Sequence, residues 1–564
     1  MKKKLLMISS VCSVFWTSTG AAAFAEPPKG VPSIEKAEKK FTADHQIHPI
    51  FTWDSPVIPS LGILQPSSAR EAGMVDAPLQ EMDGLINQAI SEKVMPGVVA
   101  FVARGGKIVK NEAYGYSVKY ADEFHTEMDT PIQMQENTIF DAASISKIFT
   151  STAIMVLYEK GLVNLDDPVM KYIPEFAQNG KEQVTVRQLL THTSGFVAWV
   201  PLYSQGNSRE DRFNLVFKQP LSMPPGSTYT YSDLNMITLG AIIERISGIR
   251  QDEFVEKNIT KPLKMRDTMY NPPESLKMRI AATEVQTVPN RGLVWGEVHD
   301  ENAWSLDGVA GHAGVFTTAQ DLATLAQTFL NNGSYGGKRI LKASTVKLLL
   351  ENQNQAFPGN DHGLGWELGQ GWYMDALSDS TSFGHTGYTG TSIVISPKHK
   401  TIAILLTNRV HPSRTTISTN GIRRIFARQT ADAIPVSIPG KGSAWFSGYG
   451  DKLSRKLEAK LDLKNKTDLT FTQWHSLEQN ADYGVVEVMV NEEWVALVKF
   501  EGTSNGWEKQ RIEVPKEAVK IRFTYHTDAS VNGRGWYIKD AKIQSKNKKT
   551  VLSFEASDWK LRNY

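Results

Sequence analysis

The sequence predicts an α+β domain followed by a separate all-β domain. From residue 69, apolar residues first recur at helical spacing and then form a short buried strand, and from 140 to 330 the pattern is mainly helical. After about residue 450, short strands of alternating polarity lie between turn residues. The chain has 564 residues, more than one hydrophobic core normally holds, so at least two domains are expected.

Residues 1–25 have the features of a signal peptide. Lys2–Lys4 form a basic start, Leu5–Trp16 is a short apolar run, and Ala23–Ala25 has the small-residue pattern that precedes a cleavage site. The apolar run is too short to cross a bilayer comfortably, and no later stretch reaches the length of a membrane span. We therefore expect a protein that is secreted or associated with the cell wall, without a membrane anchor in its mature form.

Composition excludes several classes of function. The single cysteine, Cys12, lies in the signal peptide, so the mature chain has no disulfide, no cysteine-bound metal and no thiol nucleophile. The signal peptide carries three lysines and no acidic residue, so its removal changes the formal net charge from +2 to −1. This balance gives no basic field for nucleic acid or a membrane surface. Nothing in the sequence indicates an oligomeric state.

The first domain is expected at residues 69–433. Residues 26–68 are rich in proline, lysine and polar side chains and are expected to form a linker or extended arm. Apolar spacing predicts a helix over 69–93, and a strand over 97–103 that returns through a turn at 104–107. Further helices are predicted at 144–159, 186–191, 234–247, 319–331 and 417–433, with strands at 390–395 and 403–407.

A stretch rich in Pro, Gly and Ser begins at Ile434, and we expect a linker over 434–450. The second domain, 451–564, has predicted strands at 469–474, 483–490, 495–500, 511–514, 519–525 and 536–543. That spacing indicates a β-sandwich of about 110 residues.

Ser144 and Lys147 are the first candidates for catalysis. A Ser and a Lys three positions apart at a helix start share one face of the helix, so the amine can hydrogen-bond the hydroxyl. If neighbouring charges depress the pKa of the lysine, it can accept the proton as the serine attacks a carbonyl. The helix N-terminus places backbone N–H groups where the oxyanion develops.

Two later motifs can complete such a site. Tyr231 lies on a predicted turn, 87 residues after the serine, and can pass a proton to a leaving group. His385, in His-Thr-Gly before a strand, can orient that phenol and bind the anionic end of a substrate. Gly387 allows a substrate backbone to approach, and the Tyr388 N–H can complete an oxyanion hole with that of Ser144.

Ser-x-x-Lys, Tyr-Ser-Asp and His-Thr-Gly, in this order, resemble the motifs of the active-site serine penicillin-recognising family, in its class C β-lactamase and DD-peptidase branch. The resemblance covers residues 70–430. It implies an antiparallel sheet flanked by helices beside an all-helical subdomain, with the site between them. It also implies Ser144 as nucleophile, Lys147 as acylation base and Tyr231 as proton carrier, with no metal or organic cofactor.

The sequence departs from that family at two positions. Asp233 stands where the family often has Asn, and a carboxylate cannot donate to a substrate carbonyl as an amide can. His385 replaces the lysine of most true β-lactamases, which counts against efficient β-lactam hydrolysis. Asp233, Thr386 and Gly387 remain candidates for substrate binding.

Residues 295–303, 308–314 and 407–412 are similar to a narrower clade, which includes the penicillin-binding protein 4B type and a Bacillus-type N-acetylmuramoyl-L-alanine amidase of the serine class. Within these stretches His299, Asp300 and His312 are candidates for substrate binding, and helix capping or loop packing is the alternative. The second domain resembles the jelly-roll modules of immune-inhibitor metalloproteases. Its acidic residues Asp482, Asp528 and Asp540 are a possible calcium-binding set, and its tryptophans are expected mainly in the core.

These features predict a serine hydrolase that acts on peptidoglycan peptides, either as a D-alanyl-D-alanine carboxypeptidase or as an N-acetylmuramoyl-L-alanine amidase. β-Lactams are possible further ligands. The alternatives are a carboxylesterase or D-amino-acid amidase, and a penicillin-binding protein of the cell wall with little turnover. The fold alone does not choose among these substrates.

Overall fold

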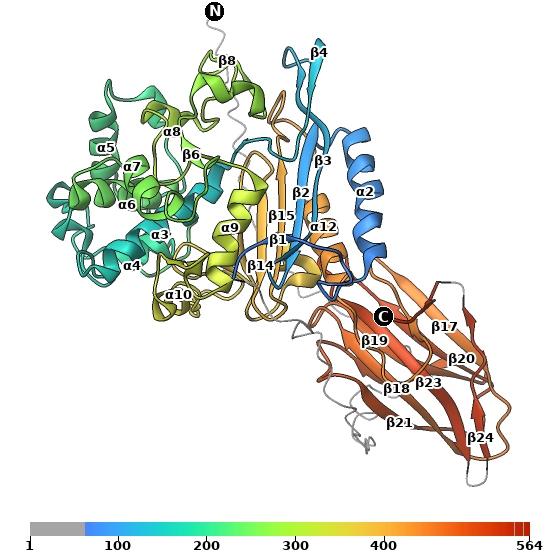
Figure 1. Cartoon of the computed structure of the whole chain (residues 1–564). Coiled ribbons are helices and arrows are strands. Elements are labelled where there is room, and N and C mark those ends of the chain that lie inside the picture. Colours follow the sequence, from blue (N-terminus) through green and yellow to red (C-terminus); the bar gives the residue numbers. More distant parts are fainter. Residues whose placement is uncertain (1–61, 546–547, 557) are drawn as a thin grey trace, which may run out of the picture.

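The computed structural model describes residues 62–545, 548–556 and 558–564, which form a helix-rich part and a strand-rich part (Figure 1). The expected signal peptide and residues 26–61 of the expected arm lie outside the described residues. Within that arm, β1 (Gln65–Pro66) pairs in parallel with β3 (Lys107–Tyr120). No helix in the described part of the chain is long and apolar enough to span a membrane.

The first domain is built on one sheet of eight strands. Its order is β1, β3, β2 (Gly97–Arg104), β15 (Thr401–Thr407), β14 (Ser392–Ser396), β13 (Phe383–Thr386) and β12 (Glu367–Leu368), and β4 (Glu127–Gln133) pairs with β3. All neighbours except β1 and β3 are antiparallel. The sheet therefore joins the start of the domain to its end, because β2 pairs with β15.

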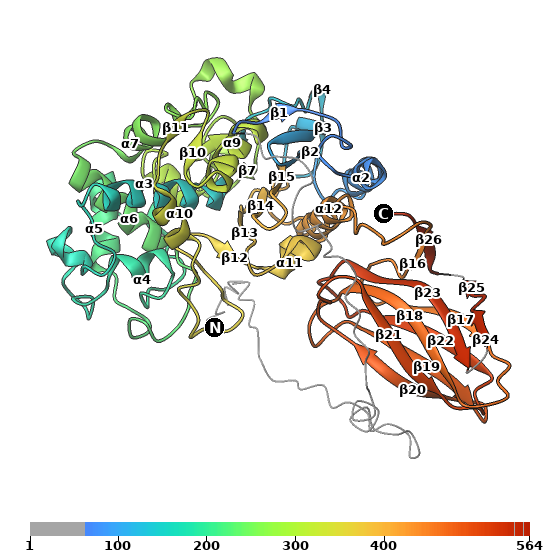
Figure 2. The ribbon, with the colours of Figure 1, turned by 60° about the horizontal axis from the view of Figure 1, so that its bottom comes forward.

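Both faces of the central strands are buried. Along β2, Val99, Phe101 and Ala103 belong to one apolar cluster, whereas Val98, Ala100 and Val102 belong to another. This alternation follows from the two-residue period of a strand. Helices α2 (Asp76–Ser91) and α12 (Asn420–Asp432) cover one face, and α9 (Ala319–Leu330) covers the other (Figure 2).

A helical unit lies beyond α9, on the side of the sheet away from α2 (Figure 1). It contains α3 (Ser146–Glu159), α4 (Val186–Leu190), α5 (Arg209–Lys218), α6 (Asp233–Ser247) and α7 (Gln251–Val255). Shorter helices are α8 (Glu301–Ser305), α10 (Ala343–Leu349) and α11 (Gly371–Met374). A small sheet of β5 (Phe140–Asp141), β9 (Val315–Thr317) and β6 (Met269–Tyr270) lies before α3, and two hairpins pair β7 (Val285–Gln286) with β8 (Gly292–Leu293) and β10 (Ser334–Tyr335) with β11 (Lys338–Arg339).

The first predicted helix starts later than its apolar spacing indicated. Helix α2 begins at Asp76, and residues before it form a turn in which Gly73 has a φ of 67°. A glycine in the left-handed conformation ends a helix. The buried apolar residues Ala69, Ala72 and Met74 therefore belong to a turn before the helix. The other predicted helices agree with the structure to within a few residues.

The second domain contains two antiparallel sheets. One has the order β21 (Glu508–Val514), β18 (Thr467–Ser476), β23 (Gly535–Ser545), β16 (Ala444–Phe446) and β26 (Lys560–Arg562), with β24 (Lys548–Val551) paired to β23. The other has the order β20 (Glu493–Phe500), β19 (Tyr483–Val490), β22 (Lys520–His526), β17 (Ser454–Lys460) and β25 (Glu555–Ala556). Apolar side chains from both sheets form a single cluster.

The two domains share packed and charged contacts. The segment expected as a linker buries Ile434, Val436 and Phe446 in the cluster that also holds α2, α12 and Trp474 of the second domain. On α12, Asp432 makes a two-pronged ion pair with Arg562 of the C-terminal strand, at 2.6 and 2.9 Å. The junction is therefore a packed interface.

We expect the substitution Arg562→Ala to lower the free energy of unfolding by about 3–5 kcal/mol, because it leaves a buried carboxylate without its cation. The Asp432 side chain is only 4% exposed. The shift of the urea unfolding midpoint measures this loss. Lys466→Ala is the matched control, since Lys466 and Glu513 are more than half exposed, and it should cost less than about 1 kcal/mol. Equal costs for both variants would contradict the prediction.

Candidate active site

Ser144 lies in a tight turn between β5 and α3. A 3-10 turn, Ala143–Ile145, leads directly into the helix, and Ala143 has a φ of 47°. This left-handed conformation is costly for alanine. The buried carboxylate of Asp141 stabilises it by accepting the Ala143 N–H at 2.8 Å and the His299 N–H at 2.6 Å. Sequence analysis did not single out Asp141, although it comes three residues before the candidate nucleophile.

Lys147 is almost fully buried and has three oxygen partners. Its Nζ lies 2.8 Å from Ser144 Oγ, 3.3 Å from the carbonyl oxygen of His312 and 2.9 Å from Asp233 Oδ1. The Ser-x-x-Lys spacing thus places the two side chains in contact on one helix face, as expected.

The groups around Lys147 raise its pKa, whereas a free amine at neutral pH would require a lowered pKa. Burial by itself lowers the pKa of Lys147, but Asp233 and the Tyr231 phenol together outweigh burial and raise it above its usual value. The resting site therefore holds an ammonium. Lys147 must lose a proton before it can accept one from Ser144.

Tyr231 lies over the lysine. Its ring centroid is 4.7 Å from Lys147 Nζ, and its phenol interacts with the side chains of Ser144 and Lys147. Burial raises the pKa of Tyr231, while the nearby ammonium lowers it. His192 supports this turn, because its Nδ1 accepts the Ser232 N–H at 3.1 Å and its ring packs 4.7 Å from that of Tyr231.

His385 does not provide a positive charge for an anionic substrate. It is 1% exposed, and its Nδ1 donates to the Thr386 carbonyl at 2.8 Å. Burial lowers the pKa of His385 to about 3, so the ring is neutral at physiological pH. Its centroid lies 6.1 Å from that of Tyr231, which is compatible with the expected role beside the phenol.

A cavity of about 360 Å³ opens over Ser144 and Tyr231. The predicted residues Thr386, Gly387 and Tyr388 line one side of it. A Cβ at Gly387 would lie 2.5 Å from the Ala142 carbonyl oxygen and 2.1 Å from Thr391 Oγ1. Only glycine allows this close approach, which brings the end of β13 against the Ser144 turn.

Arg423, which the sequence analysis missed, lines the same cavity. On α12, its Nη2 donates to the carbonyls of Gly387 and Thr391, at 2.8 and 3.0 Å. Among the described residues, no carboxylate forms an ion pair with it, and its Nε has no hydrogen-bond partner. An arginine on an amphipathic helix carries no sequence signal of this kind, since only folding brings α12 to the cavity.

Two further charged residues of the cavity were also missed. Arg409 donates to the Tyr388 carbonyl oxygen at 3.3 Å, and its guanidinium lies 5.6 Å from the centre of the Tyr388 ring. Glu367, at the edge of the sheet, has its pKa raised by burial to about 7. Near neutral pH this wall of the cavity therefore carries positive charge that is only partly balanced.

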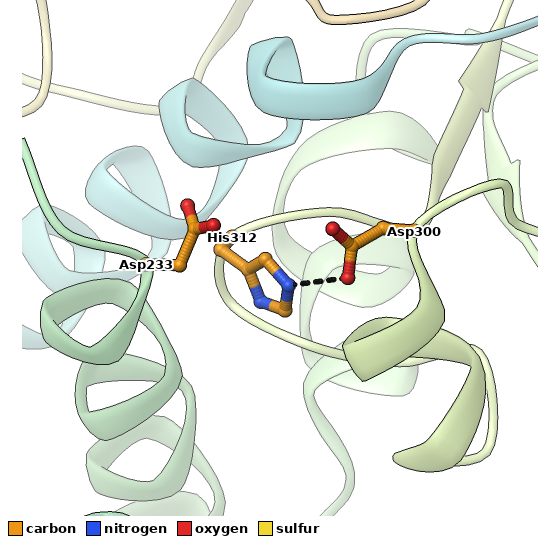
Figure 3. Close-up of side chains that lie close together, drawn as sticks. All are labelled: Asp233, Asp300 and His312. Carbon is orange, nitrogen blue, oxygen red and sulfur yellow. Dashed lines mark hydrogen bonds and ion pairs between the residues drawn. The ribbon is translucent and has the colours of Figure 1, made fainter. Parts of the chain in front are cut away.

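His299 and His312 lie behind the cavity and are not among its lining residues. His299 Nε2 is 2.9 Å from Glu284 Oε2, and its ring stacks on that of Tyr388. His312 Nε2 is 2.8 Å from Asp300 Oδ1 (Figure 3). Sequence analysis left loop packing open for both, and these buried pairs support a positioning role.

Asp233, Asp300 and His312 also come together as a possible cation site (Figure 3), with ligand atoms within 4.8 Å of one another. The Lys147 ammonium, 2.9 Å from Asp233, already supplies positive charge there. A metal ion would be repelled by it. A larger cavity of about 630 Å³ beside α7 contains none of the candidate catalytic side chains, so the smaller one is the candidate active site.

Comparisons with known proteins show the family of the chain and the proteins that it resembles. The sequence model of the family described as Beta-lactamase matches residues 82–426. A protein of Escherichia coli (strain K12) named "Putative D-alanyl-D-alanine carboxypeptidase" is 33% identical over 384 residues, 62% of this chain and 86% of its own. The structure of EstCE1, a hydrolase with promiscuous acyltransferase activity, has a TM-score of 0.50 at 21% identity, covering 63% of this chain and 99% of its own. A penicillin-binding protein homologue from Caulobacter crescentus has a TM-score of 0.49 at 18% identity, covering 64% and 97%.

The substitution Asp233→Asn should move the pH dependence of acylation to lower pH. Removing the carboxylate lowers the pKa of Lys147, so the free amine becomes populated at lower pH. The rising limb of kcat/KM for an activated ester, measured between about pH 6 and pH 10, reports this ionisation of the free enzyme. Ser144→Ala provides the background rate. A limb that stays in place would show that Lys147 is not the titrating base.

Proposed function

Because the chain belongs to the beta-lactamase family and is a serine hydrolase, we propose that it is a D-alanyl-D-alanine carboxypeptidase acting on peptidoglycan stem peptides. One observation carries the proposal. The Ser144 hydroxyl and the Arg423 guanidinium line the same cavity, and Arg423 has no ion-pair partner among the described residues. A peptide that ends in a free carboxylate next to its scissile bond matches both groups.

Arginine suits this role because its guanidinium carries a permanent positive charge and forms strong hydrogen bonds to a carboxylate. Arg423 is held in place by the carbonyls of Gly387 and Thr391, so little side-chain freedom is lost when the substrate binds. The Thr386 hydroxyl lines the same wall and offers a further donor. Burial lowers the pKa of Arg423 only to about 10, so it remains charged at neutral pH.

The reaction follows the two steps of an acyl-enzyme mechanism. Ser144 Oγ attacks the carbonyl carbon of the penultimate D-alanine, and its proton passes to Lys147 once that group is free. The N–H groups of Ser144 and Tyr388 stabilise the oxyanion. Tyr231 delivers a proton to the leaving amine of the terminal D-alanine and regains one from Lys147, its hydrogen-bond partner. Water then attacks the ester, returning the proton to Ser144 and releasing the shortened peptide.

The relatives support this substrate over the alternatives. The E. coli protein, named as a carboxypeptidase of this kind, aligns over most of its own length. An N-acetylmuramoyl-L-alanine amidase would cut a bond far from the peptide's free carboxylate, and a carboxylesterase would not need one. Neither alternative gives Arg423 a partner. We also propose that the protein is exported through its N-terminal signal sequence and meets its substrate in the cell wall.

Incubating the protein with a muramyl-pentapeptide should release one C-terminal alanine, detected by mass spectrometry as the loss of one alanine residue. Ser144→Ala should abolish this release, because it removes the nucleophile. Release of the intact peptide from the sugar would instead identify the amidase. An untouched peptide would exclude both reactions, and cleavage by the Ser144→Ala variant would show that another residue is the nucleophile.

The substitution Arg423→Gln should lower kcat/KM for a peptide ending in D-Ala-D-Ala by about 10- to 100-fold, the range expected for a charged hydrogen bond. It should have much less effect on the same peptide with a C-terminal amide, because that analogue has no carboxylate to bind. Arg424→Gln is the matched control, since Arg424 pairs with Asp451 at the domain junction instead. An equal loss on both peptides would assign Arg423 a purely structural role.

A further inference from the structure

Three carboxylates gather at the end of the second domain that faces the first. Glu478 and Asp482 lie in the loop between β18 and β19, and Asp528 follows β22, so two separate loops supply them. One oxygen from each lies within 4.8 Å of the others. In the described part of the chain, no lysine, arginine or histidine forms an ion pair with any of the three.

The cluster contains buried oxygens without partners. Asp482 is 0% exposed, and its Oδ2 has no hydrogen-bond partner in the structure. The same is true of Glu478 Oε2. Independently of these acids, the buried hydroxyl of Tyr525 also lacks a partner, and the charge of Asp482 acts on it. Buried polar atoms are normally satisfied, so several orphans at one place indicate a missing ligand.

The other oxygen of Asp482 is already used. Its Oδ1 accepts the Asp528 N–H at 3.0 Å, and the Asp482 N–H donates to the Glu478 carbonyl at 3.1 Å. These bonds fix the loops relative to each other and leave Asp482 Oδ2 and Glu478 Oε2 available. The arrangement is a preorganised set of oxygen ligands.

The three carboxylates concentrate negative charge at one place, which favours a bound cation. Burial, together with the neighbouring carboxylates, raises the pKa of Glu478 and that of Asp482 to about 7. The charge of Asp375, on the first domain, adds to both effects. Oxygen-rich anionic sites of this size suit Ca²⁺, which takes carboxylate, carbonyl and water ligands together.

We propose that Glu478, Asp482 and Asp528 bind a calcium ion that stabilises the second domain at its junction with the first. The sequence analysis named Asp482, Asp528 and Asp540 as a calcium-binding set. In the structure Asp540 is exposed on β23 and does not belong to the cluster. Glu478 takes its place. The ion would lie beside the junction residues Asp375 and Arg428, which pair at 2.8 Å.

The test compares thermal unfolding of the full protein in EDTA and in excess Ca²⁺. Near-saturating Ca²⁺ should raise the unfolding temperature of the second domain by on the order of 10 °C. Asp482→Asn should abolish this rise. In EDTA it should be at least as stable as the wild type, because it removes repulsion. Asp540→Asn is the matched control and should respond to Ca²⁺ like the wild type.

Terbium luminescence gives a second measurement. Tb³⁺ bound near Tyr525 should be sensitised by the aromatic side chain, displaced by Ca²⁺, and lost in Asp482→Asn. Absence of both the Ca²⁺ response and the Tb³⁺ signal in the wild type would overturn the proposal. The carboxyls would then share protons instead, and stability would fall as pH rises towards 7, because groups with raised pKa values favour the folded state only while protonated. A Ca²⁺ response that Asp482→Asn retains would place the ion elsewhere and would also overturn it.

Discussion

The active site depends on burying one cation, the ammonium of Lys147. A buried charge is costly unless it is paired and hydrogen-bonded, and here α6 supplies Asp233 while the loop before β9 supplies the His312 carbonyl. Three segments distant in sequence must therefore meet for the lysine to be accommodated. The same requirement places Ser144 just before the start of α3, with the Tyr231 ring above Lys147. Asp233, where the family often has a neutral amide, makes this site an ion pair at rest.

Ser144 and Arg423, which line the same cavity, come from opposite parts of the domain. The turn that carries Ser144 precedes the helical unit, whereas Arg423 belongs to α12, on the other face of the sheet. Gly387 connects them, because its missing side chain lets the end of β13 touch the Ala142 carbonyl while its own carbonyl accepts from Arg423. The cavity is thus closed by backbone contacts, and its cationic wall is fixed before a substrate arrives.

The second domain is joined to the catalytic domain by a continuous apolar cluster. Trp474, Trp507 and Tyr537 pack with residues of α2 and α12, and Asp432 on α12 pairs with Arg562 near the C-terminus. Arg423 and Asp432 lie on the same helix, so contacts with the second domain help to hold the helix that lines the active site. Trp474, Trp507 and Trp536 are nearly fully buried, as expected, whereas Trp494 is only partly buried and its ring centre lies 3.9 Å from the Arg522 guanidinium.

The sequence by itself determined the local and periodic features. Two-residue alternation predicted the strands of the second domain, and the i, i+3 spacing predicted the contact between Ser144 and Lys147, because both depend on near neighbours in the chain. The protonation states and the positions of the charged site residues depend on tertiary structure alone. The sequence could not show that Asp233 would raise the pKa of Lys147, that burial would keep His385 neutral, that Arg423 would face the cavity, or that Glu478 would replace Asp540 in the acidic cluster. Burial and charge pairing arise between residues far apart along the chain, and no local pattern encodes them.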